Sequence, residues 1–348
     1  MPPRVLVSIV TCNSERYLKP CLTSVQAQTW KEFTVCLWDN ASSDASLAVA
    51  AEFRDLFEML HSSNRNVGFC AAHNQIIAAN PSDYVLVLNP DVWLEPSFLA
   101  TLVDDVEQDA TAGSATGKLW RWDGTAQADG TSRVSQPARI LDTAGIYLTP
   151  NQRHLDRGSG ERDRGAYEMR QYVFGASGAA AFYRRAMLED VKEGAEYFDE
   201  SFFAYREDAD LAWRAQWLGW RCIYVPQARG LHVRRVLPER RAAMPPDINM
   251  HSFKNRFLLR IKNLDAATYA LFFLPITARD FAALGYVLLR ERYSLKALPL
   301  ICKAFPRAWR TRKDLIRRRR ITPHEMRNWF RRKSIDAQRS VGWPTQQS

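Results

Sequence analysis

The segment Val5-Leu-Val-Ser-Ile-Val-Thr-Cys-Asn13 decides the class of fold. Its first six residues are almost all aliphatic and mostly β-branched, and polar residues follow at once, which predicts a short buried strand. Two later segments, Phe33–Trp38 and Tyr84–Leu88, have the same character and length. The first hundred residues are therefore predicted to contain three buried strands, each ending in polar residues.

The segments between these strands have helical spacing. Glu15–Gln28 and Ser43–Phe57 place apolar residues three and four positions apart. Strand–helix–strand repeats of this kind form right-handed crossovers, which predicts an α/β fold: a doubly wound, mostly parallel sheet with helices on both faces. Ligands of such sheets bind beyond the carboxyl ends of the strands. The candidate site residues are those that follow the strands: Thr11, Asn13, Asp39, Asn40, Asn89 and Asp91.

Later segments extend this pattern after a polar interruption. Residues 113–170 are rich in Gly, Asp, Arg and Ser, and we interpret them either as a mobile loop over a site or as surface decoration. Ordered structure is expected again at Tyr172–Phe182. A helix over Glu207–Leu218 and a strand over Cys222–Val225 follow.

The positive charge lies in the last hundred residues. The chain of 348 residues has a net charge of +10, yet residues 251–348 hold 22 Lys and Arg against 6 Asp and Glu. Residues 1–250 therefore carry a net charge of −6. We predict one domain over residues 1–250 and a basic, mainly helical region over residues 251–348, because ordinary globular composition and this length suggest about two domains.

Three interpretations of the basic region are open. Nucleic-acid binding is disfavoured because the sequence lacks a zinc finger, an RNP-like aromatic pair and a clear helix-turn-helix, so no nucleic-acid partner is expected. An ordinary solvated surface is the second interpretation. The favoured one is an anionic membrane surface, because apolar stretches at Tyr269–Pro275 and Phe281–Leu289 precede the basic runs Arg317–Arg320 and Arg331–Lys333.

The expected location is cytoplasmic, peripherally attached to the inner membrane face. The start of the chain lacks the features of a signal peptide, and the longest apolar stretch, Thr268–Leu289, is interrupted by Pro275, Arg279 and Asp280. The six cysteines are scattered and form no Cys-x-x-Cys pair, which is typical of small core residues in a reducing compartment.

Asn89-Pro-Asp91 is the clearest local signal for chemistry. It follows a buried strand, Pro90 stiffens the turn, and an oxygen ligand held there suits a divalent cation that also binds a diphosphate. The alternative is a turn without a ligand. After the second strand, Asp39 is placed to accept hydrogen bonds from a ligand, whereas Ser42, Ser43 or Asp44 suits a helix cap. Arg65 and Gly68 lie in a loop that could reach phosphate.

Three acids, Glu207, Asp208 and Asp210, begin a helical stretch. The helix dipole favours carboxylates there, and an ionised acid is what a general base requires, although an acid-rich helix start has the same appearance. Asp210 and Arg214 are four residues apart and suit an ion pair. His232 follows a strand and is either structural or a ligand.

Taken together, the segments resemble the inverting family 2 glycosyltransferases of the GT-A fold, in particular a rhamnosyltransferase-like branch. The matching segments occur in the family's order between residues 5 and 235. They are Val7–Asn13, Trp38–Asp44, Asn66–Asn74, Leu88–Asp91, Gly175–Ala179, Phe198–Phe203, Glu207–Leu211 and Gly230–His232.

The resemblance implies a role for each matching position. Asp91 is the metal ligand, His232 a further metal or diphosphate contact, and Asp208 the catalytic base, with Glu207 and Asp210 as support. The implied nucleotide-binding residues are Thr11, Asn13, Asp39, Asn40, Arg65, Gly68, Asn74 and Asn89. The implied contacts to the donor sugar or the acceptor are Gly175, Ala176, Ser177 and Trp213.

The same resemblance implies an activity. One base, one divalent cation (Mg²⁺ or Mn²⁺) and no enzyme nucleophile give a single displacement with inversion. The implied donor is dTDP-L-rhamnose and the implied acceptor a saccharide or lipid-linked saccharide in cell-surface polysaccharide assembly. A UDP-hexose or UDP-N-acetylhexosamine donor is the alternative, and so is a non-catalytic protein that binds sugar nucleotides.

Overall fold

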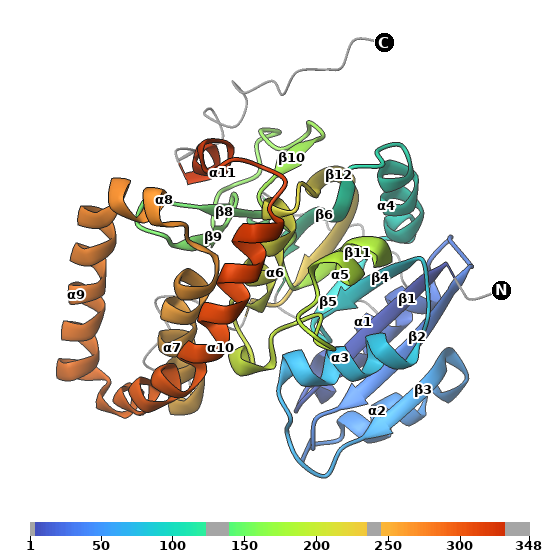
Figure 1. Cartoon of the computed structure of the whole chain (residues 1–348). Helices are drawn as coiled ribbons and strands as arrows, with labels where there is room; N and C mark the ends of the chain where they lie inside the picture. Colours follow the sequence, from blue (N-terminus) through green and yellow to red (C-terminus); the bar gives the residue numbers. More distant parts are fainter. Residues whose placement is uncertain (1–3, 123–138, 235–244, 331–348) are drawn as a thin grey trace, which may run out of the picture.

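The computed structural model describes residues 4–122, 139–234 and 245–330. Its centre is a ten-stranded sheet in which eight strands follow the order β10-β12-β6-β11-β4-β1-β2-β3, while β5 pairs with β12 and β7 with β6 (Figure 1). The strands are β1 Val5–Thr11, β2 Phe33–Asp39, β3 Phe57–Ser62, β4 Tyr84–Leu88, β5 Val92–Leu94, β6 Ala112–Arg121, β7 Leu141–Thr143, β8 Ile146–Leu148, β9 His154–Asp156, β10 Gln171–Val173, β11 Ala180–Arg184 and β12 Arg221–His232.

Helices connect these strands and continue after them. The α-helices are α1 Glu15–Gln26, α2 Ser46–Ala51, α3 Phe69–Ala79, α4 Phe98–Glu107, α5 Arg185–Val191, α6 Glu207–Trp217, α7 Pro246–Asn263, α8 Ala266–Leu271, α9 Phe273–Arg290, α10 Ala297–Arg318 and α11 Pro323–Phe330. Three 3₁₀ turns are η1 Arg54–Leu56, η2 Glu200–Phe202 and η4 Arg292–Lys296.

The first half of the sheet is parallel, as predicted. β1 pairs in parallel with β2 and β4, and β2 with β3. In this register Thr11 lies opposite Asp39, so the carboxyl ends of β1 and β2 meet at one edge of the sheet. Beyond β4 the sheet is mixed, because β11 is antiparallel to both β4 and β6, while β6 and β12 are parallel.

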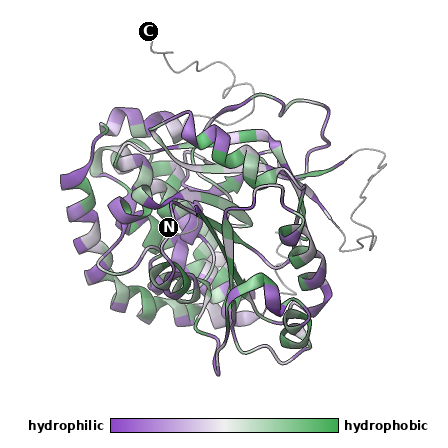
Figure 2. Ribbon diagram, turned by 90° about the vertical axis from the view of Figure 1, so that its right-hand side faces the viewer, coloured by the Kyte–Doolittle hydropathy of each residue, from purple (hydrophilic) through white to green (hydrophobic). Residues whose placement is uncertain are grey.

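Two apolar cores cover the two faces of the sheet, as expected for a doubly wound fold. Along β1, Val5, Val7 and Ile9 point into one core with α1 and α4, whereas Leu6 points into the other with α3, α5 and α6. The interior strands are accordingly mostly hydrophobic in Figure 2. The predicted α/β class with helices on both faces is confirmed.

Three details of the predicted layout were wrong. The helix expected over Ser43–Phe57 ends at Ala51, and an unpredicted strand, β3, begins at Phe57. The helix α3 was also missed. The polar interruption over residues 113–170 contains β6, whose residues 112–120 are all buried. Small residues there permit close packing: a Cβ atom on Gly117 would lie 2.2 Å from the carbonyl oxygen of Ala228.

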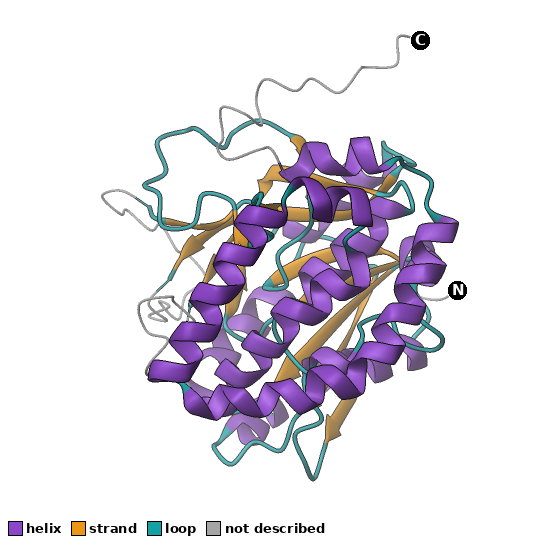
Figure 3. Ribbon diagram, turned by 60° about the vertical axis from the view of Figure 1, so that its left-hand side comes forward, coloured by secondary structure: helices purple, strands orange, loops and turns teal. Residues whose placement is uncertain are grey.

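The helices that follow residue 245 pack against the sheet-bearing part of the chain (Figure 3). Trp217, at the end of α6, donates a hydrogen bond of 2.8 Å to the carbonyl oxygen of Asn263. Phe330 of α11 packs on Trp213. Side chains before and after residue 250 are thus in contact. A domain boundary near residue 250 stays a prediction.

Two further expectations concern membrane spans and cysteines. Among the described helices, none combines the length and the apolar character needed to cross a bilayer. Four cysteines are buried and none of the six forms a disulfide, which agrees with the expectation of small core residues. The basic run Arg331–Lys333 lies outside the described residues.

Candidate active site

Two buried polar atoms mark the edge where β1 and β2 end. Thr11 and Asp39 are both fully buried, and neither the Thr11 hydroxyl nor Oδ1 of Asp39 has a hydrogen-bond partner among the described residues. The other carboxylate oxygen of Asp39 accepts from the backbone N–H of Ser42 at 3.0 Å. Buried polar atoms are nearly always paired, so these two are suited to a bound ligand.

The loop after β2 is built by short-range hydrogen bonds. Asn13, at φ +51°, accepts the backbone N–H of Ser43 at 2.8 Å. Asp44 accepts the backbone N–H groups of Glu15 and Ser46, the first residues of α1 and α2, at 3.1 and 3.0 Å. The N-cap positions are Ser14 and Ala45, but Asp44 accepts the first N–H group of each helix, much as the capping interpretation expects. Asp39 is left for another role.

Asn40 fixes the loop that precedes α3. Its side-chain oxygen accepts from the indole N–H of Trp38 and the backbone N–H of Val67, each at 3.2 Å, and its amide donates to the carbonyl of Gly68 at 3.1 Å. Gly68 has φ +89°, and a Cβ atom there would lie 2.6 Å from the ring of Phe203. These contacts favour a positioning role for Asn40. Arg65, in the same loop, is exposed.

Asn74 ties α3 to the segment before the acid-rich helix. Its oxygen accepts the backbone N–H groups of Tyr197 and Phe198, and its amide donates to the carbonyl of Phe198 and the carboxylate of Glu200. All four distances lie between 2.8 and 3.1 Å. The side chain is thus occupied by protein groups, which favours a structural role over contact with a nucleotide.

Asp91 and His232 come together from distant parts of the chain. Oδ1 of Asp91 lies 3.5 Å from Nε2 of His232, and the strands β5 and β12 that adjoin them are paired. Nδ1 of His232 is 2.7 Å from Oδ2 of Asp142, a fully buried carboxylate on β7. Although burial opposes a charged imidazole, the carboxylates of Asp142 and Asp91 raise the pKa of His232 to about 10.

Sequence reasoning missed Asp142. It stands ninety residues before His232, in a segment interpreted either as a mobile loop or as surface decoration, so spacing gave no signal. Arg234 also binds it, with Nη1 3.0 Å from Oδ1. The carboxylate therefore orients the imidazole and leaves Nε2 directed at Asp91.

The geometry of this pair fits a divalent cation. Two ligand atoms about 3 Å apart can occupy neighbouring positions around an ion bound at about 2.1 Å, and Asp91 and His232 are separated by a similar distance. A histidine ligand commonly bonds a carboxylate through its second nitrogen, as His232 does. Among the described residues, no group of three or more His, Cys, Asp or Glu side chains is arranged to hold a metal.

Asp208 is linked to the turn Asn89–Asp91 through the segment between β10 and β11. The backbone N–H of Asn89 donates to the carbonyl of Ala179 at 2.9 Å, and the adjacent backbone N–H of Gly178 donates to Oδ2 of Asp208 at 3.1 Å. Gly178 lies within the matching segment Gly175–Ala179 but is not among the predicted site residues, and its backbone is what contacts Asp208. Asn89 itself is half-buried.

Burial changes the protonation of both acids at the start of α6. It raises the pKa of Asp208 to about 6, against the hydrogen bond from Gly178. It raises the pKa of the neighbouring Glu207 further, to about 8, with the negative charge of Asp208 adding to the effect. At neutral pH, Asp208 is ionised and Glu207 holds a proton.

The rest of the segment Gly175–Ala179 packs against α6. A Cβ atom on Gly175 would lie 2.3 Å from Cβ of Ala212, so this position requires glycine. Ala176 and Ser177 are buried. Trp213 is fully buried, with its ring 6.1 Å from Phe174 and 5.3 Å from Phe330. This placement favours a packing role for Trp213 over contact with a sugar.

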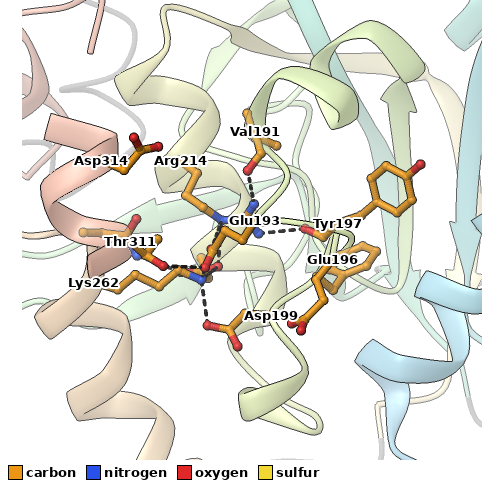
Figure 4. Close-up of polar contacts among 12 residues, drawn as sticks. Val191, Glu193, Glu196, Tyr197, Asp199, Arg214, Lys262, Thr311 and Asp314 are labelled. Carbon is orange, nitrogen blue, oxygen red and sulfur yellow. Dashed lines mark hydrogen bonds and ion pairs between the residues drawn. The ribbon is translucent and has the colours of Figure 1, made fainter. Parts of the chain in front are cut away.

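Asp210 belongs to a buried ion cluster. Figure 4 labels Arg214, Lys262 and Asp199 of this cluster. Oδ2 of Asp210 accepts from Arg214 at 2.9 Å and from Lys262 of α7 at 2.8 Å, and Oδ1 accepts from Asn263 at 2.8 Å. Lys262 also lies 2.8 Å from Asp199. The predicted pair of Asp210 with Arg214 is present, and both carboxylate oxygens are occupied, which argues against a direct part in proton transfer.

Strained backbone precedes α6. Phe203, Tyr205 and Arg206 all have φ between +67° and +73°, which side chains other than glycine rarely adopt. Asn255 of α7 holds this turn with its side-chain amide, which lies 2.9, 2.9 and 2.8 Å from the carbonyl oxygens of Phe202, Ala204 and Tyr205. The part of α7 in the site was not foreseen from the sequence.

A surface pocket lies on the other side of the ion cluster. It has a volume of about 560 Å³ and is lined by residues 191–196 and by α10. It is thus separate from Asp91 and Asp208, and its lining mixes arginines with carboxylates.

Comparisons with known proteins agree with this architecture. The family model for glycosyl transferase family 2 matches residues 6–192. The N-acetylglucosaminyl-diphospho-decaprenol L-rhamnosyltransferase of Mycobacterium tuberculosis (strain ATCC 25618 / H37Rv) is 29% identical over 240 residues, which is 65% of this chain and 75% of that protein. The putative glycosyltransferase EpsH of Bacillus subtilis (strain 168) is 23% identical over 213 residues, covering 59% and 55% of the two chains.

Solved structures support the fold. Residues 1–349 of TarS from S. aureus, in complex with UDP-GlcNAc, match with a TM-score of 0.54 and 19% identity over 97% of this chain and 89% of that one. The chain covers 54% of a longer TarS structure. Because the family model spans more than half of the sequence and the fold agrees, this chain belongs to glycosyl transferase family 2.

Proposed function

We propose that the enzyme transfers L-rhamnose from dTDP-L-rhamnose to a hydroxyl of a lipid-linked saccharide, with inversion, in cell-surface polysaccharide assembly. The relative from M. tuberculosis, named as a rhamnosyltransferase acting on a diphospho-decaprenol acceptor, supports the donor sugar and the acceptor class. The observation that carries the proposal is the hydrogen-bonded link from Asp208 to Asn89 through the backbone of Gly178 and Ala179.

Asp208 acts as the general base. The acceptor hydroxyl must lose a proton as it attacks the anomeric carbon, and a carboxylate with a pKa of about 6 accepts that proton better than an ordinary aspartate. Glu207 is protonated at neutral pH and keeps a second negative charge out of the site. Asp210 holds α6 in place through its ion cluster.

Thr11 and Asp39 bind the nucleotide. Their unpartnered buried atoms accept and donate hydrogen bonds to a base or ribose at the edge of the sheet. The further nucleotide contacts in this proposal are Asn13, Arg65, Gly68 and Asn89. Asn40 and Asn74 hold in place the loop that shapes this part of the nucleotide site. The absence of a side chain at Gly68 lets Phe203 pack directly against this loop.

Asp91 and His232 hold a divalent cation, Mg²⁺ or Mn²⁺. When bound, the cation stabilises the negative charge that grows on the leaving diphosphate. His232 must release its proton to become a ligand, and Asp142 keeps the ring oriented through Nδ1. The distant structural neighbour GalNAc-T7 was solved with UDP, GalNAc and Mn²⁺, which agrees with this class of ion.

The helical region after residue 250 attaches the enzyme to an anionic membrane surface. Large hydrophobic side chains that are exposed in the described residues all lie between Tyr269 and Trp309, with Met169 as the one exception. Exposed basic side chains alternate with them: Arg290, Arg292, Lys296, Lys303 and Arg310. Apolar and basic residues on one set of helices are typical of interfacial binding, and a solvated surface would not expose so much apolar area.

A thermal-shift panel tests the donor and the cation. dTDP-, UDP- and GDP-sugars are compared with Mg²⁺ and with Mn²⁺, because a ligand that binds the folded state raises the melting temperature. We expect dTDP-L-rhamnose with a divalent cation to give the largest shift. A larger shift with UDP-N-acetylglucosamine would overturn the donor assignment, and equal shifts with EDTA would overturn the metal assignment.

A further inference from the structure

The hairpin of β8 and β9 turns one face toward the core of the molecule. Residues directly opposite each other in an antiparallel pair point to the same side. Four side chains share a face in this way: Ile146 and Leu148 of β8 with Asp156 and His154 of β9. Ile146 and Leu148 are buried in the apolar core that also holds α6, so this face is the inner one. The backbone N–H of Ile146 donates to the carbonyl of Gly175 at 2.8 Å, which joins the hairpin to the segment that leads to β11.

The inner face of β9 is bonded to both parts of the proposed catalytic centre. Nη1 of Arg206, the residue directly before α6, lies 2.8 Å from Nδ1 of His154. Two residues further along β9, Asp156 pairs with Arg234, which also binds Asp142 behind the proposed metal ligand. One short strand is therefore connected by side-chain contacts to the start of the helix that bears the proposed base and to the residues behind the cation site.

The contact with Arg206 fixes the tautomer of His154. A guanidinium group has N–H donors and no acceptor, so Nδ1 of His154 must be the acceptor of this hydrogen bond. A neutral imidazole that accepts at Nδ1 carries its proton at Nε2. Burial and the positive charge of Arg206 lower the pKa of His154 well below its ordinary value, in agreement with a neutral ring. The Nε2–H group is therefore a hydrogen-bond donor at neutral pH.

This donor is left for a group from outside the described chain. In residues 4–122, 139–234 and 245–330, the hydrogen bond at Nδ1 is the one that the His154 ring makes. The side chain is half-buried, so the ring is not sealed within the core. Donors on an inner face nearly always find an acceptor, and the ring stands beside Arg206, which immediately precedes Glu207 and Asp208. An oxygen atom of a bound substrate would satisfy the Nε2–H group there.

We propose that the Nε2–H group of His154 donates a hydrogen bond to a hydroxyl oxygen of the acceptor saccharide and so orients the acceptor toward Asp208. This inference rests on the proposed function. The hairpin is joined to Gly175 just after β10, the end strand opposite β3, whereas the proposed nucleotide contacts Thr11 and Asp39 lie on β1 and β2. That separation favours the acceptor over the nucleotide. A neutral imidazole also supplies a donor without adding a positive charge beside the base.

Nitrogen NMR of isotope-labelled histidine tests the donor directly, with His154→Gln to identify the signals of this ring. We expect the Nε2-protonated tautomer in the free protein and a shift of its Nε2 signal when farnesyl-diphospho-N-acetylglucosamine is added with EDTA and without nucleotide. His73, a buried histidine bonded to Ser8 at 2.7 Å, is the control, and its signal should not move. An Nδ1-protonated ring would overturn the proposal, as would a shift with dTDP in place of the shift with the saccharide.

Steady-state kinetics separate acceptor recognition from a structural role. His154→Ala should raise KM for the same saccharide by about 2-fold to 10-fold, as the loss of one neutral hydrogen bond does, and leave the affinity for dTDP unchanged. His154→Gln keeps an N–H donor and should restore most of the loss. His324→Ala, at an exposed position on α11, is the matched control and should behave as the unchanged protein.

Calorimetric binding of the saccharide distinguishes the two ways of failing. If the unchanged protein binds it and the His154 signal stays in place, the proposed function stands and this inference is wrong. If the unchanged protein does not bind it, the acceptor assignment fails, and the inference fails with it. A lower melting temperature and kcat for His154→Ala at an unchanged KM would assign the ring a structural role through Arg206 and overturn the proposal.

Discussion

The side-chain amide of Asn255 donates a hydrogen bond of 2.8 Å to the carbonyl oxygen of Tyr205, a residue held at φ +69°. The two residues are fifty positions apart, and Tyr205 stands three residues before Asp208. The same amide reaches the carbonyls of Phe202 and Ala204. A residue of α7 thus fixes the backbone from which the proposed base projects.

Asn255→Ala should lower kcat without weakening donor binding. The change leaves buried carbonyls without a donor, which costs about 2 kcal/mol of folding stability and lets the strained turn relax. Thermal denaturation, kcat and dTDP affinity are measured together. Asn80→Ala, which removes an amide bonded to the carbonyl of Ile76 in α3, is the control and should change stability alone. Equal kcat values for the two variants would contradict the positioning role.

Asp208→Asn should reduce kcat/KM by a factor of about 10² to 10⁴, because the amide cannot accept the hydroxyl proton. Donor binding should persist, since Asp208 is proposed to act on the acceptor. Steady-state kinetics and dTDP-L-rhamnose binding check both statements. Near-normal transfer by Asp208→Asn would remove it as the base, and the matched change Asp210→Asn should act mainly on stability, through Lys262 and Asn263.

The rate should fall on the acid side with a midpoint near pH 6. The base works as a carboxylate, and burial raises the pKa of Asp208 to about 6, so protonation removes activity as the pH drops through that value. The pH profile of kcat/KM reports the free enzyme. A midpoint near pH 4 would place the titrating group elsewhere.

Glu207→Gln should stabilise the protein most at alkaline pH. The folded state holds the Glu207 proton up to about pH 8, whereas an unfolded glutamate loses it near pH 4.5. Between these values the folded state binds more protons, so stability falls as the pH rises. Melting temperatures from pH 5 to 9 should fall less steeply for Glu207→Gln than for the unchanged protein, and parallel curves would contradict the raised pKa.

Asp142→Asn should weaken metal activation by about 10-fold to 100-fold, because a carboxylate behind a histidine ligand orients it and increases its basicity. The measurement is the concentration of Mn²⁺ that gives half-maximal activity. Asp156→Asn is the control, since Asp156 pairs with Arg234 without contacting His232. The same shift in both variants would attribute the effect to Arg234 and not to the imidazole.

Phe281→Asp and Leu289→Asp should reduce sedimentation with phosphatidylglycerol vesicles. Both side chains are at least 70% exposed on α9, and a carboxylate there opposes both apolar insertion and attraction to anionic lipid. Met169→Asp, at an equally exposed position outside the helical region, should sediment normally. Unchanged sedimentation of the α9 variants would exclude this face as the membrane contact.

The sequence predicted the parallel half of the sheet and the residues at its edge because strands and their polar ends are local features. Thr11 and Asp39 were found in this way. Asp142 and Asn255 were not, because their importance depends on contacts across 90 and about 50 residues. The strand β6 was not predicted because its small residues are also typical of loops. Their role is visible only in the structure, where Ala228 packs against Gly117.

The ion cluster that joins Lys262 to Asp199 and Asp210 sets an order for making the enzyme. A nascent chain that has emerged only as far as residue 245 contains every residue of the proposed catalytic set, yet Asp199 and Asp210 still lack one of their buried cations, Lys262. The contacts of α7 with the helix that bears Asp208 can form only after α7 has left the ribosome. Gene truncations and domain swaps that divide the chain at residue 250 would reproduce that unfinished state.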